Sequence, residues 1–314
     1  MKLGIDMGGM SIKMGLVNEE NKIIGRITIP TDLTVPYQTL VERMADAVRQ
    51  MLENAGMTLE QCGGIGIGSP GTIDAKQGVI LYSNNFGWEN VPIVEKLKKH
   101  LDTRIEIAND ADAAALGEVC AGAAEGAENA VLLTLGTGVG SGVILDKKIF
   151  RGAMPGGCEL GHLSIRYDGI RCTCGRKGCL EAYASASALL RIAREKAAEH
   201  PESIMNEMCG NDLEQMNGKI PFDAAKAGDE AGMETVKEYE GYLACGIANV
   251  INTFRPEKVI LGGGVAAQKD NLTAPLKDLV KDMCFGGSHG HIADIVTSVL
   301  GNDAGIIGAA NLVV

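Results

Sequence analysis

The spacing of apolar residues predicts long helices in three parts of the chain. Residues 41–56, VERMADAVRQMLENAG, carry apolar side chains at intervals of three and four, which gather on one helix face, and Gly56 follows as a stop signal. The same intervals predict helices at 181–200 and 234–254, and a proline follows each within two residues. The segment 303–314 predicts a further helix that returns to pack on the first domain.

Shorter apolar runs between these helices predict strands. Residues 104–119, RIEIANDADAAALGEV, are typical of a strand that runs directly into a helix. The run at 63–74 predicts a short strand followed by a Pro-Gly turn, and the run at 258–266 predicts a strand that meets a glycine turn. Strands that alternate with helices indicate an α/β fold with mixed or parallel sheets covered by helices.

Two segments share one order of elements, an apolar strand, a glycine-rich turn and a second apolar strand. They are IDMGGMSIKMGLV at 5–17 and LTLGTGVGSGVIL at 133–145. Their separation suggests a duplicated α/β design with a boundary near Asn109–Asp110. The predicted domains are therefore a smaller one, 1–109 plus 301–314, and a larger one, 110–300.

Composition and charge narrow the class of protein. Of the 314 residues, 46% are apolar and 22% charged, which predicts a soluble globular protein with an ample core. The net charge is −11 without a basic cluster, so a nucleic-acid surface is not expected. No run approaches ~20 apolar residues and the N-terminal residues lack an apolar signal core, so we expect no membrane span and a cytoplasmic location. Reduced cysteines in that compartment favour metal binding over disulfides.

The paired turns favour phosphate binding, because glycine lets backbone N–H groups approach an anion closely. Two facing turns could hold the phosphates of a nucleotide from both sides, with Asp6 at a strand end to orient Mg²⁺ through water. The third glycine cluster could admit the face of an adenine ring. The candidate residues are Gly8, Gly9 and Lys13 in the first turn, Gly136, Thr137, Gly138 and Gly140 in the second, and Gly262, Gly263 and Gly264 in the third.

Other interpretations of the turns are weaker. Neither turn is followed by the Lys-Ser/Thr pair of a Walker loop. The GTGVGSG sequence leads into a strand, whereas a dinucleotide fingerprint requires a helix there. Two tight hairpin turns without a ligand remain the alternative.

Asp110 is the candidate general base. It follows a predicted strand and opens a predicted helix, so capping of the helix by Asn109 or Asp110 is the competing explanation. Phosphoryl transfer needs a carboxylate that orients a hydroxyl and accepts its proton, together with Mg²⁺ and donors to the phosphates. One residue can serve both roles.

Carboxylates and amides elsewhere match the needs of a sugar, whose hydroxyls both donate and accept hydrogen bonds. The candidate set is Asn84, Asn109, Glu159 and Glu181. Ordinary solvated surface charges are the alternative for the two glutamates.

Three cysteines in CTCGRKGCLEAY predict a metal centre. Cys172, Cys174 and Cys179 supply three thiolates, and His162 is the nearest histidine upstream, which completes the Cys3His set that structural Zn²⁺ commonly takes. The absence of a CxxC pair disfavours thioredoxin-like chemistry. Free core cysteines and redox chemistry remain the alternatives. A metal would fix one nitrogen of His162, and the other could then face a substrate hydroxyl.

With these residues assembled, the chain resembles the ROK family of sugar kinases over essentially its full length, and within it the bacterial glucokinases. The motifs that carry the resemblance are DMGGMSIK and LGTGVGSGVI for phosphate, NDADAAALGE for catalysis, GGCELGH with CTCGRKGCLE for the zinc-linked sugar site, and SNNFGWENVP near the sugar. Two positions depart from the family pattern. Met10 stands where threonine is usual, so that Ser11 is the remaining hydroxyl of that motif, and Ala108 stands where glutamate is often found.

The resemblance implies an actin-like ATPase fold of the ribonuclease H-like type, with duplicated domains, a cleft between them and a homodimeric assembly. It implies transfer of phosphate from Mg-ATP to the 6-hydroxyl of a hexose, with glucose as the expected substrate and Asp110 as the base. It implies structural Zn²⁺ on His162, Cys172, Cys174 and Cys179. It places the sugar at Gly71, Asn84, Asn109, Asp110, Glu159, His162 and Glu181.

Rival hypotheses differ in substrate or class. Within kinases they are N-acetylglucosamine, N-acetylmannosamine, mannose and allose kinases. A sugar sensor without turnover is favoured only by Met10. An actin-like ATPase that activates another enzyme, with an iron–sulfur cluster on the cysteines, is the third.

Overall fold

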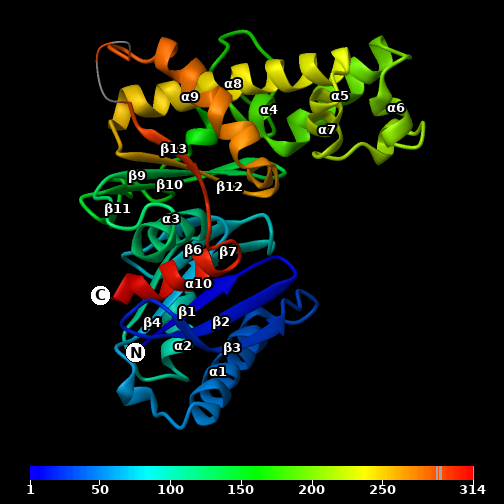
Figure 1. Ribbon diagram of the computed structural model, residues 1–314. Coiled ribbons are helices and arrows are strands. Elements are labelled where there is room, and N and C mark those ends of the chain that lie inside the picture. The colour runs from blue at the N-terminus through cyan, green and yellow to red at the C-terminus, as the bar shows by residue number, and fades with distance from the viewer. Residues whose placement is uncertain (288, 290–291, 314) are drawn as a thin grey trace. The chain divides into compact units, whose positions relative to one another are not determined.

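The computed structural model describes residues 1–287, 289 and 292–313, which form two compact units (Figure 1). The first unit contains 1–132, 142–158 and the residues from Val299 on, and the second contains 133–141 and 159–298. Position 314, which closes the predicted small domain, lies outside the described residues, as do 288 and 290–291 inside the predicted large one.

These units differ from the predicted domains in where the helix α3 (Asp110–Ala121) belongs. It lies in the first unit, because it packs closely on α10 (Asp303–Ala310). A Cβ on Gly117 would collide with the backbone of Ala304, and a Cβ on Gly308 with the backbone of Ala113. Glycines on both helices therefore permit this contact, which sequence periodicity does not reveal.

The first unit is built on a mixed sheet with the order β3-β2-β1-β4-β8. Its strands are β1 (Lys2–Met7), β2 (Ser11–Val17), β3 (Ile23–Pro30), β4 (Ile65–Ser69) and β8 (Ile105–Asn109). β1 is parallel to β4, which is parallel to β8, while β2 is antiparallel to both of its neighbours. Since parallel strands end at the same edge, Asp6, Ser69 and Asn109 lie along one edge of this sheet.

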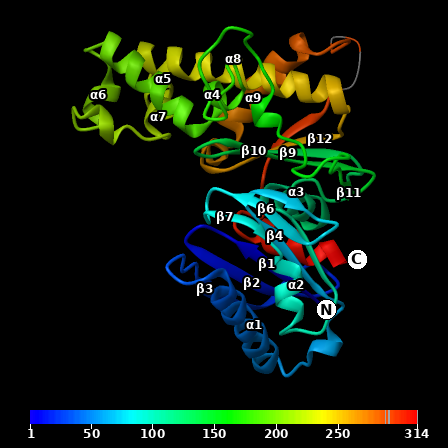
Figure 2. The same ribbon diagram turned by 180° about the vertical axis from the view of Figure 1, so that it is seen from behind.

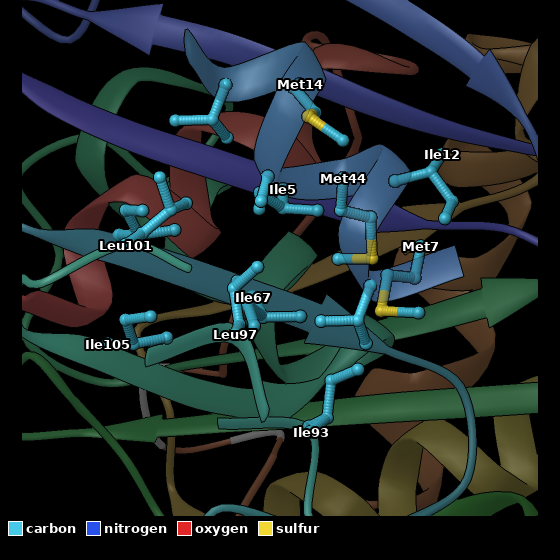
Figure 3. Close-up of a cluster of buried hydrophobic side chains, with 14 of the residues drawn as sticks. Ile5, Met7, Ile12, Met14, Met44, Ile67, Ile93, Leu97, Leu101 and Ile105 are labelled. Atoms are coloured by element: carbon cyan, nitrogen blue, oxygen red, sulfur yellow. The ribbon is translucent and has the colours of Figure 1, made fainter. Parts of the chain in front are cut away.

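One face of this sheet carries the apolar core. Alternate residues of the strands pack against α1 (Tyr37–Asn54) and α2 (Ile93–Lys98), which lie on the same side of the sheet (Figure 2). Figure 3 shows Met44 among the strand residues Ile5, Met7 and Met14. The predicted helix at 41–56 is thus confirmed as the second and later turns of α1.

α10 lies directly on the opposite face of the sheet, where glycines face it. A Cβ at Gly4 would collide with the carbonyl oxygen of Ile306, and one at Gly66 with that of Ala309. The return of the C-terminal helix to the first unit is therefore confirmed, and it depends on strands without side chains at the contact.

The second sheet repeats this order, as β11-β10-β9-β12-β13. Its strands are β9 (Ala130–Leu135), β10 (Val139–Leu145), β11 (Lys148–Ile149), β12 (Lys258–Gly262) and β13 (Asp294–Thr297). Numbered along the chain within each half, both sheets have the order 3-2-1-4-5, so the predicted duplication is confirmed. A small antiparallel sheet contains β5 (Thr72–Asp74), β6 (Val79–Ser83) and β7 (Trp88–Val91).

One predicted helix of the second unit differs from the helices that the structure shows. They are α4 (Glu181–Ala184), α5 (Ala186–Glu199), α6 (Ile204–Met208), α7 (Ile220–Lys226), α8 (Glu230–Phe254) and α9 (Asp270–Met283). The predicted single helix at 181–200 is wrong, because extended backbone at Ser185 divides it. The Ser185 hydroxyl caps α5 by accepting from the Ala188 N–H at 3.1 Å. The predicted helix at 234–254 is confirmed within α8.

Glu240 on α8 is a buried carboxyl that gives a test of stability against pH. Only 6% of it is exposed, and burial raises its pKa to about 7. Above that pH the folded protein holds a desolvated negative charge, which costs roughly 3 kcal/mol at most by conversion of the pKa change.

Glu240→Gln is therefore expected to stabilise the protein above pH 8 by about 1–3 kcal/mol. The gain should fade between about pH 7 and 4.5, because the wild-type carboxyl is then protonated in the folded state. Urea unfolding across this pH range measures the difference in the free energy of unfolding between the variant and the wild type. Glu238→Gln, at a half-buried position of the same helix, serves as the control, and a pH-independent difference would contradict the assignment.

In the described part of the chain, no helix is long and apolar enough to cross a membrane.

Candidate active site and metal centre

Asp110 and Asn109 occupy the junction of β8 and α3 in the first unit. Asn109 caps the helix, since its Oδ1 accepts from the N–H of Ala111 at 2.8 Å. Its amide also donates to the carbonyl of Gly71 at 3.2 Å. The capping explanation thus applies to Asn109. This arrangement brings Gly71 and the Asn109–Asp110 pair together.

Two half-buried carboxyl groups of this unit have raised pKa values. Burial raises the pKa of Asp110, and it raises the pKa of Asp6 to about 6 although the charge of Lys13 lowers it. The Asp110 charge raises the pKa of Asp6 further. A cation beside Asp6 would relieve this repulsion, so its surroundings fit the carboxylate that the sequence analysis assigned to Mg²⁺.

The first turn joins β1 to β2. The Gly8 N–H donates to the carbonyl of Ser11 at 3.0 Å, whereas nothing lies within 4 Å of a Cβ built on Gly9. Lys13 extends to the side chain of Asn302 at 3.3 Å. Met10 is 91% exposed and contributes no hydroxyl. The turn therefore has open space at Gly9 and a cation close to Asp6.

The second turn, at 136–138 between β9 and β10, is anchored inside the second unit. The carbonyl of Gly136 accepts from the N–H of Ala186 at 2.8 Å, and the carbonyl of Thr137 accepts from the Ser187 hydroxyl at 2.9 Å. The Gly136 N–H donates to the carbonyl of Gly138 at 3.0 Å, so the N–H groups of Thr137 and Gly138 are the ones that the turn can offer to a ligand. Sequence reasoning missed Ser187, which no local motif distinguishes from any serine in the first turn of a helix.

The third glycine cluster follows β12 in the second unit. Gly263 has φ +83°, and a Cβ there would lie 2.5 Å from the carbonyl oxygen of Leu135, so glycine is required. Gly264 lines a cavity of about 470 Å³ with Ala186 and residues of α7 and α9. The space fits the expectation that this cluster admits an adenine ring.

The four predicted metal ligands come together in the second unit. One ligand atom from each of His162, Cys172, Cys174 and Cys179 lies within 4.8 Å of the others. The His162 Nδ1 is 3.6 Å from the Cys172 Sγ, and the Sγ atoms of Cys174 and Cys179 are 3.7 Å apart. Zn–S bonds of about 2.3 Å in a tetrahedron place sulfurs about 3.8 Å apart, so this donor set fits Zn²⁺.

The thiols also need a positive charge to ionise together. Burial raises the pKa of Cys172, and burial with the neighbouring thiols raises that of Cys179 to about 12. The pKa of Cys174 is lowered, chiefly by the backbone N–H of Arg176. Zn²⁺ binds thiolates, so the ion would supply the charge that this cluster lacks.

Glu181 connects the cluster of His162 and the three cysteines to the second turn. Its Oε1 accepts from the Thr173 hydroxyl at 2.8 Å and lies 3.5 Å from the Cys172 Sγ. Its Oε2 accepts from the N–H of Val139 at 3.1 Å. Sequence reasoning assigned Glu181 to the sugar alone and missed this connection.

The remaining candidates lie near these groups. Asn84 follows β6 in the first unit and is exposed, with its Oδ1 3.5 Å from the Tyr82 hydroxyl. Glu159 precedes the short helix at Leu160–His162 in the second unit, and its carbonyl accepts from the N–H of His162 at 3.0 Å. Each unit thus gathers its own part of the predicted sugar set.

The two sheets of equal order, with a glycine turn after the first strand of each, define an actin-like ATPase fold of the sugar-kinase class. The chain matches the ROK family over residues 2–314 and belongs to it.

Individual relatives cover nearly the whole chain. A glucokinase from Thermotoga maritima is 36% identical over 312 residues, which is 99% of this chain and 96% of that protein. A ROK family glucokinase from Streptomyces griseus, solved with glucose and AMPPNP, is 32% identical with a TM-score of 0.79 over 99% of this chain and 98% of that one. A xylose repressor from Caldicellulosiruptor bescii is 29% identical over 90% of this chain and 70% of that protein.

Proposed function

We propose that this chain is an ATP-dependent hexokinase that transfers the γ-phosphoryl group of ATP to the 6-hydroxyl of glucose. The observation that carries the proposal is the half-buried carboxyl of Asp110 with its raised pKa, placed beside the capping Asn109 at the edge where Asp6 also lies. The names of the relatives support this choice, because two of them are glucokinases and one was solved with glucose and an ATP analogue.

Asp110 would act as the general base. Its carboxylate accepts the proton of the 6-hydroxyl as that oxygen bonds to the γ-phosphorus, while the bond to the ADP oxygen breaks. Asn109 holds the start of α3 and the loop at Gly71, so it positions both the base and the sugar. The raised pKa makes Asp110 a stronger base than an ordinary aspartate once it is ionised.

The nucleotide would use both glycine turns. Gly8, Gly9, Ser11 and Lys13 bind phosphate from the first unit, and Gly136, Thr137 and Gly138 from the second. The adenine occupies the cavity beside Gly262, Gly263 and Gly264. Mg²⁺, when bound, neutralises charge on the transferring phosphates, and Asp6 is the residue that would orient it.

Zn²⁺ would be structural in this enzyme. Its ligand His162 uses Nδ1 toward the thiols, which leaves Nε2 to meet a sugar hydroxyl. Glu159 and Glu181 are held beside the same cluster and complete the sugar set. We also propose that the protein is cytoplasmic and forms a homodimer. Sedimentation of the purified protein tests the homodimer.

A substrate panel tests the proposed function. Purified protein is assayed with Mg-ATP and glucose, mannose, allose, N-acetylglucosamine or N-acetylmannosamine, and ADP release is coupled to an indicator reaction. Glucose is expected to give the highest kcat/KM. A higher kcat/KM for an N-acetylhexosamine would replace glucose as the substrate, but the protein would still be a kinase. Sugar binding by calorimetry without any ADP release would contradict the kinase and favour a sensor, the role that the exposed Met10 suggests.

A further inference from the structure

A separate cavity of about 270 Å³ lies beside the second turn, wholly within the second unit. It is bounded by the turn, the loop that carries the metal ligands and the first turns of α5. The lining side chains that matter for its chemistry are Thr137, Arg171, Thr173, Glu181, Ser185 and Arg191. No role in the proposed reaction falls to the two arginines.

Two arginines line the cavity, in a chain whose net charge is −11. Arg171 forms no ion pair or side-chain hydrogen bond with any other residue that the structure describes. Arg191 contacts Glu195 through Nη1 alone, at 3.1 Å, in a partly exposed pair that is worth little. Its other guanidinium N–H groups stay available to a ligand.

The carboxylate in the lining does not cancel these charges. Glu181 already accepts from Thr173 and from the N–H of Val139, so both of its oxygens are engaged. Both donors are neutral groups that hold the carboxylate in place. The lining carries two arginines against one carboxylate and the Cys172 thiol, whose charge as a thiolate the metal would offset.

Hydroxyl donors complete the lining. Ser185 is only 3% exposed and accepts from the N–H of Ala188, which leaves its own proton to donate. Thr137 contributes an exposed hydroxyl from the turn. The 14-residue α5 begins here, and its N-terminal dipole adds positive potential. Guanidinium forks with hydroxyl donors suit the tetrahedral oxygens of phosphate, not an uncharged sugar.

We propose that this cavity binds a phosphate group of a small molecule other than the nucleotide donor. The phosphate is held by Arg171 and Arg191, with Ser185 as the hydroxyl donor. A ligand in this cavity contacts both the second turn and the loop that carries the predicted metal ligands, and so it connects both to α5. The inference goes beyond the proposed function and does not require turnover, because the ligand binds the protein without sugar or ATP.

The test is titration calorimetry of the zinc-loaded protein with inorganic phosphate, tripolyphosphate and glucose 6-phosphate in separate arms. Binding in the millimolar range or tighter is expected for at least one probe, with affinity falling as salt rises. Tightest binding of inorganic phosphate, the phosphate chain or the sugar phosphate identifies the source. Arg171→Gln and Arg191→Gln should each weaken binding by about tenfold or more.

Arg166→Gln is the matched control, since it removes one charge from the same loop outside the cavity. It should bind the probes as the wild type does. Arg171→Lys and Arg191→Lys keep the charge but lose the planar fork, and they serve if a glutamine variant fails to fold. They should also weaken binding.

Three outcomes would overturn the proposal. The first is that no probe binds in the millimolar range. The second is equal weakening by Arg166→Gln, which would show only a general effect of charge. The third is a parallel rise in KM for ATP in the Arg171 and Arg191 variants, which would make the cavity part of the donor site.

Discussion

Asp110→Asn should lower kcat with glucose by about 10²–10⁴, while sugar affinity stays near that of the wild type. Asparagine keeps the size of the side chain and the hydrogen bond to the N–H of Ala111, but it cannot accept the hydroxyl proton. Steady-state kinetics and glucose titration on the same preparation measure the two effects. Turnover within a few fold of the wild type would show that another group is the base.

The same variant should be more stable than the wild type at pH 7. The pKa of Asp110 is raised by burial, so its ionised form is disfavoured in the folded state and reduces stability above that pKa. The gain from asparagine should shrink as pH falls, because the wild-type carboxyl is then protonated. The exposed Asp102→Asn is the control and should change neither kcat nor the melting temperature.

The kcat should also depend on the protonation of Asp110. The base form of Asp110 is lost as pH falls through its raised pKa, so kcat should decline at a higher pH than an ordinary aspartate near 4 would give. A decline that begins only below pH 4 would contradict the burial effect.

Cys174→Ser should abolish metal binding and lower the melting temperature by ten degrees or more. Cys174 is exposed, so the change removes little packing and its effect reports the lost ligand. Metal binding is coupled to folding, and structural Zn²⁺ sites contribute about 10 kcal/mol in small peptides. Metal analysis is expected to find one zinc per wild-type chain and none in the variant.

Two controls separate the effect of losing the metal from the effect of losing a thiol. Wild-type protein treated with a strong chelator should melt at the temperature of Cys174→Ser. Cys245→Ser, on α8 outside the cluster, should retain zinc and the wild-type melting temperature. Full zinc content in Cys174→Ser would contradict the ligand set, and a brown protein with visible absorbance would indicate an iron–sulfur cluster.

The sequence alone could predict those features of the fold that depend on near neighbours. The two strand–glycine–strand segments, the junction at Asn109–Asp110 and the long helix α8 all follow from spacing within a few residues. The grouping of Cys172, Cys174 and Cys179 was predictable for the same reason, since three cysteines within eight residues are typical of a metal site.

The helix break at Ser185 could be found only from the tertiary structure. The sequence there continues the helical pattern, but the N–H of Ala186 donates to Gly136, which is distant in the chain. That bond competes with the helix and no local pattern reports it. The placement of α3 in the first unit is similar, because glycines such as Gly117 acquire their meaning only against α10.

What the sequence determined by itself is the inventory of chemical groups and the local elements that carry them, because hydrogen bonding within a turn and apolar periodicity act over a few residues. The tertiary structure decided which groups share an environment. It buried Asp110 and Asp6 enough to raise each pKa, engaged both oxygens of Glu181, and brought Arg171 and Arg191 to the lining of one cavity. Burial and charge proximity arise from contacts between distant segments, and those contacts exist only once the chain has folded.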